Sequence, residues 1–140
     1  MPSPASPSAS PSPAEGRAAK AQATAWLAAA LDALPAHVCL VDGDGTILWV
    51  NRAWRTFAAD NGGQRQAVCE GANYFKACEA SIAGRDFAAR LREVLAGQRD
   101  LAEVEYTCHA PAEERWFGAT ATRLDDGATP RAVLVHHAVT

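Results

Sequence analysis

The sequence predicts an α+β fold, a five-stranded antiparallel sheet with short helices on one face and a further helix at the N-terminus. The length of 140 residues allows one domain and a tail. With 49% hydrophobic and 21% charged residues, the composition indicates a packed core and argues against wholesale disorder. Five runs have the alternation or the β-branched and aromatic content of strands, and helical patterns separate the first two runs from the last three. This order is typical of helices gathered on one face of a sheet.

The N-terminal part of the chain divides into a tail and a helix. Residues 1–14 hold five of the eight prolines and five serines, so we expect a disordered tail. Residues 15–34 are alanine-rich with apolar positions three and four apart, which predicts a helix that Pro35 ends. Its narrow apolar stripe is expected either to pack against the domain or to form a homodimer interface. The stripe consists of Trp26, Leu27, Ala30, Leu31 and Leu34.

The domain that follows is predicted at residues 35–140. A hairpin comes first, because Asp42-Gly43-Asp44-Gly45 is a strong turn signal between two apolar runs. Asn51 stands where a helix cap belongs, and Asn61-Gly62-Gly63 ends that helix. In order, the predicted elements are strands at 37–41 and 46–50, the helix after Asn51, helices at 73–80 and 86–96, and strands at 102–109, 115–124 and 131–139.

Charge and hydropathy exclude several classes of partner. The net charge of −3, from 13 basic and 16 acidic residues, gives no basic excess for binding nucleic acid. No stretch reaches the roughly 18 apolar residues of a membrane span, and no segment has the apolar region of a signal peptide. We therefore expect a cytoplasmic protein that binds neither nucleic acid nor membrane. Its cysteines should be reduced, buried, small apolar side chains: Cys39, Cys69, Cys78 and Cys108.

Several motifs in this order resemble a known family. They are Val41-Asp42-Gly43-Asp44-Gly45-Thr46-Ile47, Val50-Asn51-Arg52-Ala53-Trp54, Gly71-Ala72-Asn73-Tyr74-Phe75, Glu105-Tyr106-Thr107-Cys108-His109-Ala110-Pro111 and Glu114-Arg115-Trp116-Phe117. Together they are similar to a bacterial subgroup of PAS domains often found in sensor kinases, over about residues 31–140. The resemblance implies sensing or docking, with a small-molecule pocket between the sheet and the helices.

The resemblance also implies where cofactors of such domains would bind, and the sequence departs from both patterns. A flavin photosensor of this kind carries Gly-Arg-Asn-Cys, whereas this chain has Gly71-Ala72-Asn73-Tyr74. Haem-binding members commonly offer a histidine from the long helix, and residues 86–96 contain none. Cys78 or Cys108 would be the thiolate alternative. Zinc at Cys108-His109 and His136-His137 is disfavoured, because neighbouring strand residues point to opposite faces. We expect no cofactor, with haem or flavin as the alternative.

The functional residues are expected in the aromatic interior rather than in a catalytic motif. No nucleophile elbow, zinc-protease or phosphate-loop motif occurs, so we expect no enzyme. The interior is interpreted either as a ligand pocket or as a filled core, and Asn73 either as a pocket residue or as a helix cap. The candidate pocket residues are Trp54, Asn73, Tyr74, Cys78, Tyr106, Cys108 and Trp116.

The end of the last strand leads to an expectation about output. Related domains that drive a kinase or cyclase commonly end in Asp-Ile-Thr or Asp-Val-Thr before a coiled coil, whereas this chain ends Ala138-Val139-Thr140. We expect a stand-alone sensory and interaction module that forms a homodimer or docks onto a separate kinase or cyclase. The alternative functions are a haem or flavin redox or gas sensor and, third, a small enzyme.

Overall fold

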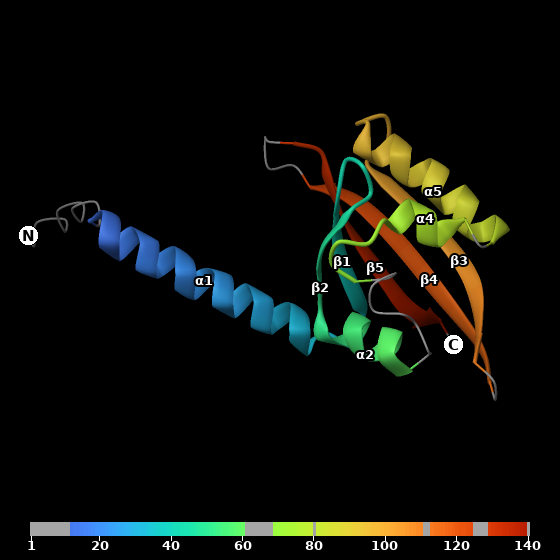
Figure 1. Cartoon of the computed structure of the whole chain (residues 1–140), viewed down its shortest axis with the longest axis horizontal. Helices are drawn as coiled ribbons and strands as arrows, with labels where there is room; N and C mark the ends of the chain where they lie inside the picture. The colour runs from blue at the N-terminus through green and yellow to red at the C-terminus, as the bar shows by residue number, and fades with distance from the viewer. Residues whose placement is uncertain (1–11, 61–68, 80, 111–112, 125–128, 140) are drawn as a thin grey trace, which may run out of the picture. The chain divides into compact units, whose positions relative to one another are not determined.

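The computed structural model describes residues 12–60, 69–79, 81–110, 113–124 and 129–139; at residues 60, 106–110, 113–117 and 139 it describes the backbone only. It confirms the predicted α+β class, with an N-terminal helix, a five-stranded antiparallel sheet and short helices (Figure 1). The elements are α1 (Pro13–Ala33), β1 (His37–Asp42), β2 (Ile47–Val50), α2 (Arg52–Asp60), α4 (Tyr74–Cys78), α5 (Ile82–Leu95), β3 (Leu101–Ala110), β4 (Glu113–Leu124) and β5 (Arg131–Val139).

The strands are ordered β2-β1-β5-β4-β3, and every neighbouring pair is antiparallel. The last strand of the chain therefore lies in the centre of the sheet, between the first strand and β4. Its register with β1 pairs His37 with His136 and Cys39 with Leu134. This pairing places the start of β1 beside the end of β5, in neighbouring strands of the sheet.

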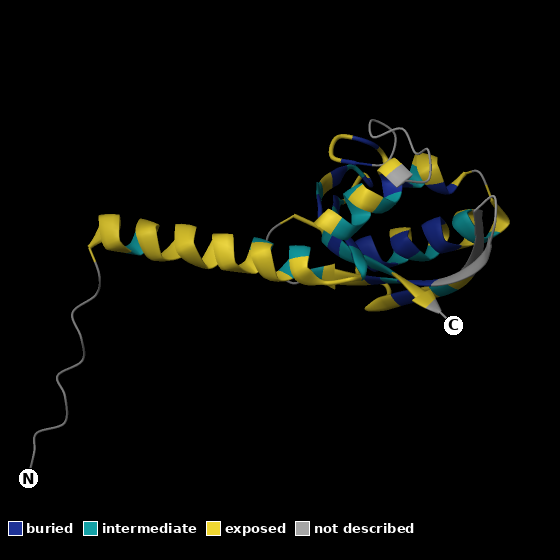
Figure 2. Ribbon diagram, turned by 90° about the horizontal axis from the view of Figure 1, so that it is seen from below, coloured by how far each residue is buried: buried dark blue, intermediate teal, exposed yellow. Residues whose placement is uncertain are grey.

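The core lies between one face of the sheet and the helices α4 and α5 (Figures 1 and 2). Alternate residues of β1 and β5, among them Cys39, Val41 and Leu134, are fully buried there. From the opposite side, Phe87 and Leu91 of α5 are buried against them. Burial of this alternating face against one helical stripe accounts for the strand and helix periods seen in the sequence.

Helix α5 begins at Ile82, four residues before the start predicted at Asp86. Ser81 has an extended backbone, and its hydroxyl accepts a hydrogen bond from the Gly84 main-chain N–H at 2.9 Å. This is the geometry of an N-cap. The predicted helix was too short because Gly84 interrupts the apolar pattern that marked the rest.

The chain divides into two compact units, Met1–Ala30 and Leu31–Thr140. Helix α1 begins at Pro13, two residues before the predicted Glu15, because the Ser12 hydroxyl accepts from the Glu15 N–H at 3.2 Å and proline suits the first helical position. Residues 1–11 of the predicted tail lie outside the described residues. No residue of α1 is buried, and most of its ribbon is yellow, for exposed, in Figure 2. Trp26 and Leu27 are 65% and 66% exposed.

Within the part of the chain that the structure covers, no helix combines the length and apolar content needed to cross a membrane.

Candidate functional site

The interior of the domain contains a hydrogen-bonded pair, here called the Tyr74–His136 pair. Tyr74 is the first residue of α4 and His136 lies on β5, on the same face of the strand as the buried Leu134. The Tyr74 hydroxyl and the His136 Nε2 are 2.8 Å apart. Tyr74 also shares a side-chain hydrogen bond with the Cys78 thiol, one helical turn further along α4. Three polar groups are thus linked inside an otherwise apolar core.

The turn between β1 and β2 holds Tyr74 in place. The Tyr74 main-chain N–H donates to the Gly45 carbonyl at 2.7 Å. Asn73 donates from Nδ2 to the Asp44 carbonyl at 3.0 Å, and its Oδ1 caps α4 by accepting from the Lys76 N–H at 3.2 Å. Gly45 has a φ of 82°, and a Cβ at this position would collide with the Phe75 ring. The Asp-Gly turn predicted from the sequence therefore also positions the polar pair.

Aromatic rings surround the pair, and we call Trp54, Tyr74, Phe87 and His136 the aromatic cluster. The Trp54 ring meets the His136 ring edge to face, with centroids 5.2 Å apart and planes at 87°. Phe87 approaches His136 at 6.4 Å and 77°, and Tyr74 approaches it at 6.0 Å and 66°. Edge-to-face packing is a favourable geometry for such rings, so the imidazole is enclosed on three sides by flat apolar surfaces.

The groups of the cluster are uncharged at neutral pH. Burial of the His136 imidazole, together with repulsion from His37 and His137, lowers its pKa to about 3. Burial also lowers the pKa of His37, which is paired with His136 across β1 and β5. The pKa of the Cys78 thiol rises to about 11, because burial outweighs the opposing effects of the Tyr74 hydrogen bond and of Arg92.

One side of the cluster reaches solvent. His37, Trp54, Phe57 and His136 are half-buried, whereas Tyr74 and Phe87 are 6% and 2% exposed. The His37 and Phe57 rings lie next to each other, with centroids 4.6 Å apart. The polar pair therefore lies next to a rim of rings that are partly exposed to solvent.

A second network connects helix α2, which carries Trp54, to the last turn of α1. Asn51 is fully buried, and its Oδ1 accepts from the N–H groups of Val38 and Trp54, each at 3.0 Å. Its Nδ2 donates to the carbonyls of Leu31 at 2.8 Å and Ala36 at 2.9 Å. Next to it, the Arg52 main-chain N–H donates to Asp32 at 2.8 Å. We call Asn51 with these partners the Asn51 junction. The sequence predicted the cap but not the links to residues 31 and 36.

The structure brings together three of the predicted pocket residues, Trp54, Tyr74 and Cys78. Asn73 is exposed and caps α4, which confirms the second of its two interpretations. For the other three, the structure gives only the strands, β3 for Tyr106 and Cys108 and β4 for Trp116, and their side chains lie outside the described residues.

His136 is the functional residue that the sequence reasoning missed. It was considered only as a zinc ligand beside His137. Alternation along β5 with Ala132 and Leu134 could have placed it on the buried face. Among the described residues, no three metal-binding side chains converge, and Cys39, Cys69 and Cys78 are free and buried as predicted.

Comparison with known proteins agrees with this architecture. A family model described as PAS fold matches residues 31–140. An uncharacterized 104.1 kDa protein of Rhodobacter capsulatus, in the hypE 3' region, is 42% identical over 121 residues, which cover 81% of this chain and 13% of that protein.

Two solved structures share the fold. The PAS domain of BvgS from Bordetella pertussis superposes with a TM-score of 0.60 at 15% identity, covering 85% of this chain and 88% of that one. A PAS domain from a two-component sensor histidine kinase gives a TM-score of 0.59 at 10% identity, covering 86% and 99%. The chain belongs to the PAS fold family, as its motifs predicted.

Proposed function

We propose that this PAS domain is a sensory module that binds a small molecule at the Tyr74–His136 pair. The observation that carries the proposal is a hydrogen-bonding pair set among aromatic rings, with one half-buried side. Ligand sites in proteins combine apolar walls with a few oriented polar groups in this way. The filled core that the sequence left as an alternative predicts a domain that never retains a ligand.

The route by which binding would change the rest of the protein runs through Trp54. Its ring contacts His136 at one end, and its main-chain N–H donates to Asn51 at the other. Asn51 in turn holds the carbonyl of Leu31, in the last turn of α1. A ligand that moves the Trp54 ring would therefore disturb the hydrogen bond from Trp54 to Asn51, and through Asn51 the hydrogen bond to Leu31. A packed junction with discrete arrangements can transmit such a conformational change.

Native mass spectrometry of the protein purified from its own host tests this function. We expect a retained small molecule on the wild-type protein and its loss from Tyr74→Phe, which keeps the ring but removes the hydroxyl. Ile82→Ala is the control, because the Ile82 side chain on α5 is 79% exposed. A wild-type protein that carries no molecule, and whose melting temperature no fraction of a host metabolite extract raises, would contradict the proposal.

We also propose that the domain signals through a homodimer in which α1 forms the contact. Trp26 and Leu27 present large apolar surfaces, exposed by about two thirds, on a helix whose remaining residues are mostly alanine. The chain spans 13% of the length of its Rhodobacter capsulatus relative, so a stand-alone role and docking to a separate kinase or cyclase also stay predictions.

The molar mass in solution tests the dimer. Leu27→Glu should convert a dimer to a monomer in light scattering, because it places a charge in the proposed apolar contact. Ala25→Glu introduces the same charge on the opposite side of the helix and should leave the mass unchanged. A mass that does not differ between wild type and Leu27→Glu would contradict the contact.

A further inference from the structure

We infer that the ligand of this domain is an uncharged, ring-shaped molecule with an amide, hydroxyl or carbonyl group, which exchanges hydrogen bonds with Tyr74 and His136. This inference rests on the proposed function, because it assigns a ligand class to the same pair. It is carried by the absence of charge among the described groups that face the pair and by the shape of the rings around it.

Each described titratable group around the pair is of a kind that stays neutral in this setting. His37 and Cys39 face it from β1, and Cys78 faces it from α4. His137, the next residue on β5, is exposed. Burial is the largest influence on His37, Cys39 and Cys78, and it disfavours their charged forms.

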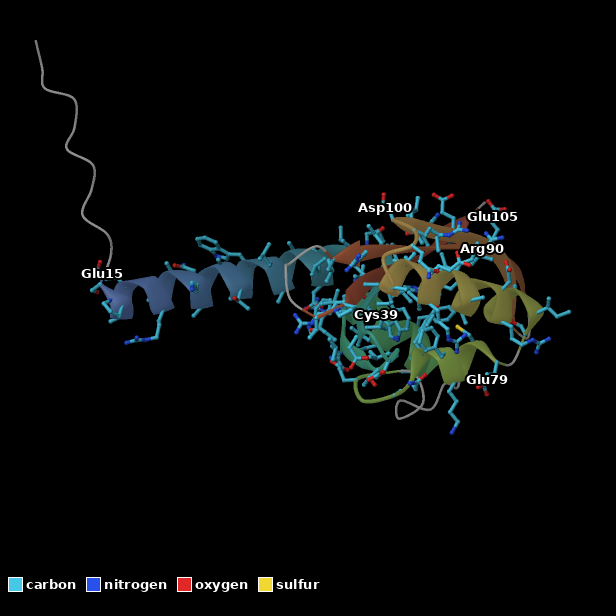
Figure 3. All side chains as sticks on the ribbon, turned by 90° about the horizontal axis from the view of Figure 1, so that it is seen from above. Glu15, Cys39, Glu79, Arg90, Asp100 and Glu105 are labelled. Carbon is cyan, nitrogen blue, oxygen red and sulfur yellow. The ribbon has the colours of Figure 1, made fainter. Side chains whose placement is uncertain are left out.

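The described ion pairs lie on the surface of the domain. They are Arg55 with Glu70, Arg90 with Asp86, and Arg99 with Glu93. Of the residues labelled in Figure 3, Cys39 is fully buried, whereas Glu79, Asp100 and Glu105 are exposed.

Arg92 is the cation with a described influence on the interior. Its guanidinium lies over the Phe75 ring, 4.2 Å from the centroid, and it acts on Cys78 from there. Burial nevertheless outweighs this effect, since the Cys78 thiol keeps a raised pKa.

Among the described residues that face the pair, none would supply a counter-charge to a charged ligand, and burial of a charge without one is strongly unfavourable. A carboxylate could gain one by protonating His136, but with a pKa of about 3 that protonation is disfavoured on the order of 10⁴-fold at pH 7. A neutral amide avoids this cost. A hydroxyl and a neutral imidazole can each donate and accept hydrogen bonds. The pair can therefore bind either the N–H or the carbonyl oxygen of an amide.

The rings define the shape of the ligand. Trp54 and Phe87 both meet the His136 ring nearly at right angles, at 87° and 77°, so the surfaces around His136 are flat ring faces and ring edges. Planar rings pack best against such surfaces. Opposite His136 in the register, β4 contributes only the methyl group of Ala119.

Three probes of nearly the same shape isolate charge as the variable: neutral benzamide, anionic benzoate and cationic benzamidinium. We would measure their dissociation constants at pH 7 by NMR, from the side-chain signals of His136 and Tyr74 in the full chain. Benzamide is expected to bind at least tenfold more tightly than either ion. Benzoate or benzamidinium binding as tightly as benzamide would overturn the inference.

Two further measurements separate this inference from the proposed function. If none of the probes binds but the protein from its host retains a molecule, the ring-shaped class is wrong and the sensory function stands. If the host protein is also empty, both are wrong. Tyr74→Phe should weaken benzamide about five- to tenfold, the value of one hydrogen bond, while Ile82→Ala, at an exposed position of α5, leaves it unchanged. If wild type and Tyr74→Phe bind benzamide with equal affinity, the Tyr74–His136 pair is not the binding site.

Discussion

The side-chain amide of Asn51 donates a hydrogen bond to the main-chain carbonyl of Leu31, at 2.8 Å, across twenty residues of sequence. The same side chain accepts from Trp54, so one buried residue caps α2 and holds the last turn of α1. No described buried side-chain nitrogen or oxygen lacks a hydrogen-bond partner. The entry into the domain and the helix behind the aromatic cluster are thus joined by one amide.

Replacing Asn51 with Ala should destabilise the domain by about 3 kcal/mol or more, because several main-chain groups lose their partner together. Urea unfolding followed by tryptophan fluorescence measures this change. Asn73→Ala, which removes an exposed cap, should cost about 1 kcal/mol. Equal losses in the two variants would mean that Asn51 acts only as a helix cap.

Gly45→Ala should destabilise the domain by more than Gly71→Ala. Both glycines have a positive φ, 82° and 88°, so alanine is strained at each by about 1 to 2 kcal/mol. At Gly45 the new methyl group would also collide with the Phe75 ring, whereas nothing lies within 4 Å of it at Gly71. The thermal midpoints of the two variants give the comparison, and indistinguishable midpoints would show that Phe75 yields without cost.

The stability of the domain should fall as the pH decreases from about 6.5 toward 3. The His136 pKa drops from 6.5 in the unfolded chain to about 3 in the folded one, so the unfolded state binds the proton first. The contribution of His136 to the free energy of unfolding is therefore complete above pH 6.5. As the pH falls from 6.5 toward 3, this contribution decreases by up to about 1.4 kcal/mol per pH unit. His37 contributes with the same sign, since its pKa is also lowered.

Denaturant unfolding at a series of pH values measures this dependence. His136→Gln should flatten it, because the variant has no group to titrate at this position. His137→Gln should retain it, since His137 is exposed. A wild-type profile that is level from pH 6.5 to 4 would contradict the enclosed, neutral imidazole.

Phe87→Ala should cost about 3 to 5 kcal/mol, since the ring is 2% exposed and packs against Tyr74 and His136. Ile82→Ala, on the same helix but 79% exposed, should change stability by less than about 0.5 kcal/mol. Calorimetry measures both. A small effect of Phe87→Ala would show that neighbouring side chains collapse into the vacated space.

Part of the site could be read from the sequence, and part could not. Tyr74 and Cys78 were found because they follow a recognisable cap at Asn73 and are spaced one helical turn apart. Their partner His136 was not found, because it is 62 residues away and adjoins another histidine. Local patterns show which residues share a face, but they do not show which faces meet.

The sequence alone determined the class of the fold, the order of its elements and the Asp-Gly turn, because periodicity, capping and turn chemistry act over a few residues. The family followed from motifs of the same local kind. The tertiary structure decided that β5 lies beside β1, which puts His136 opposite His37 and within reach of Tyr74. It also decided that Asn51 binds Leu31 and that His136 stays neutral. These properties depend on burial and on contacts between distant segments, which exist only after the sheet has formed.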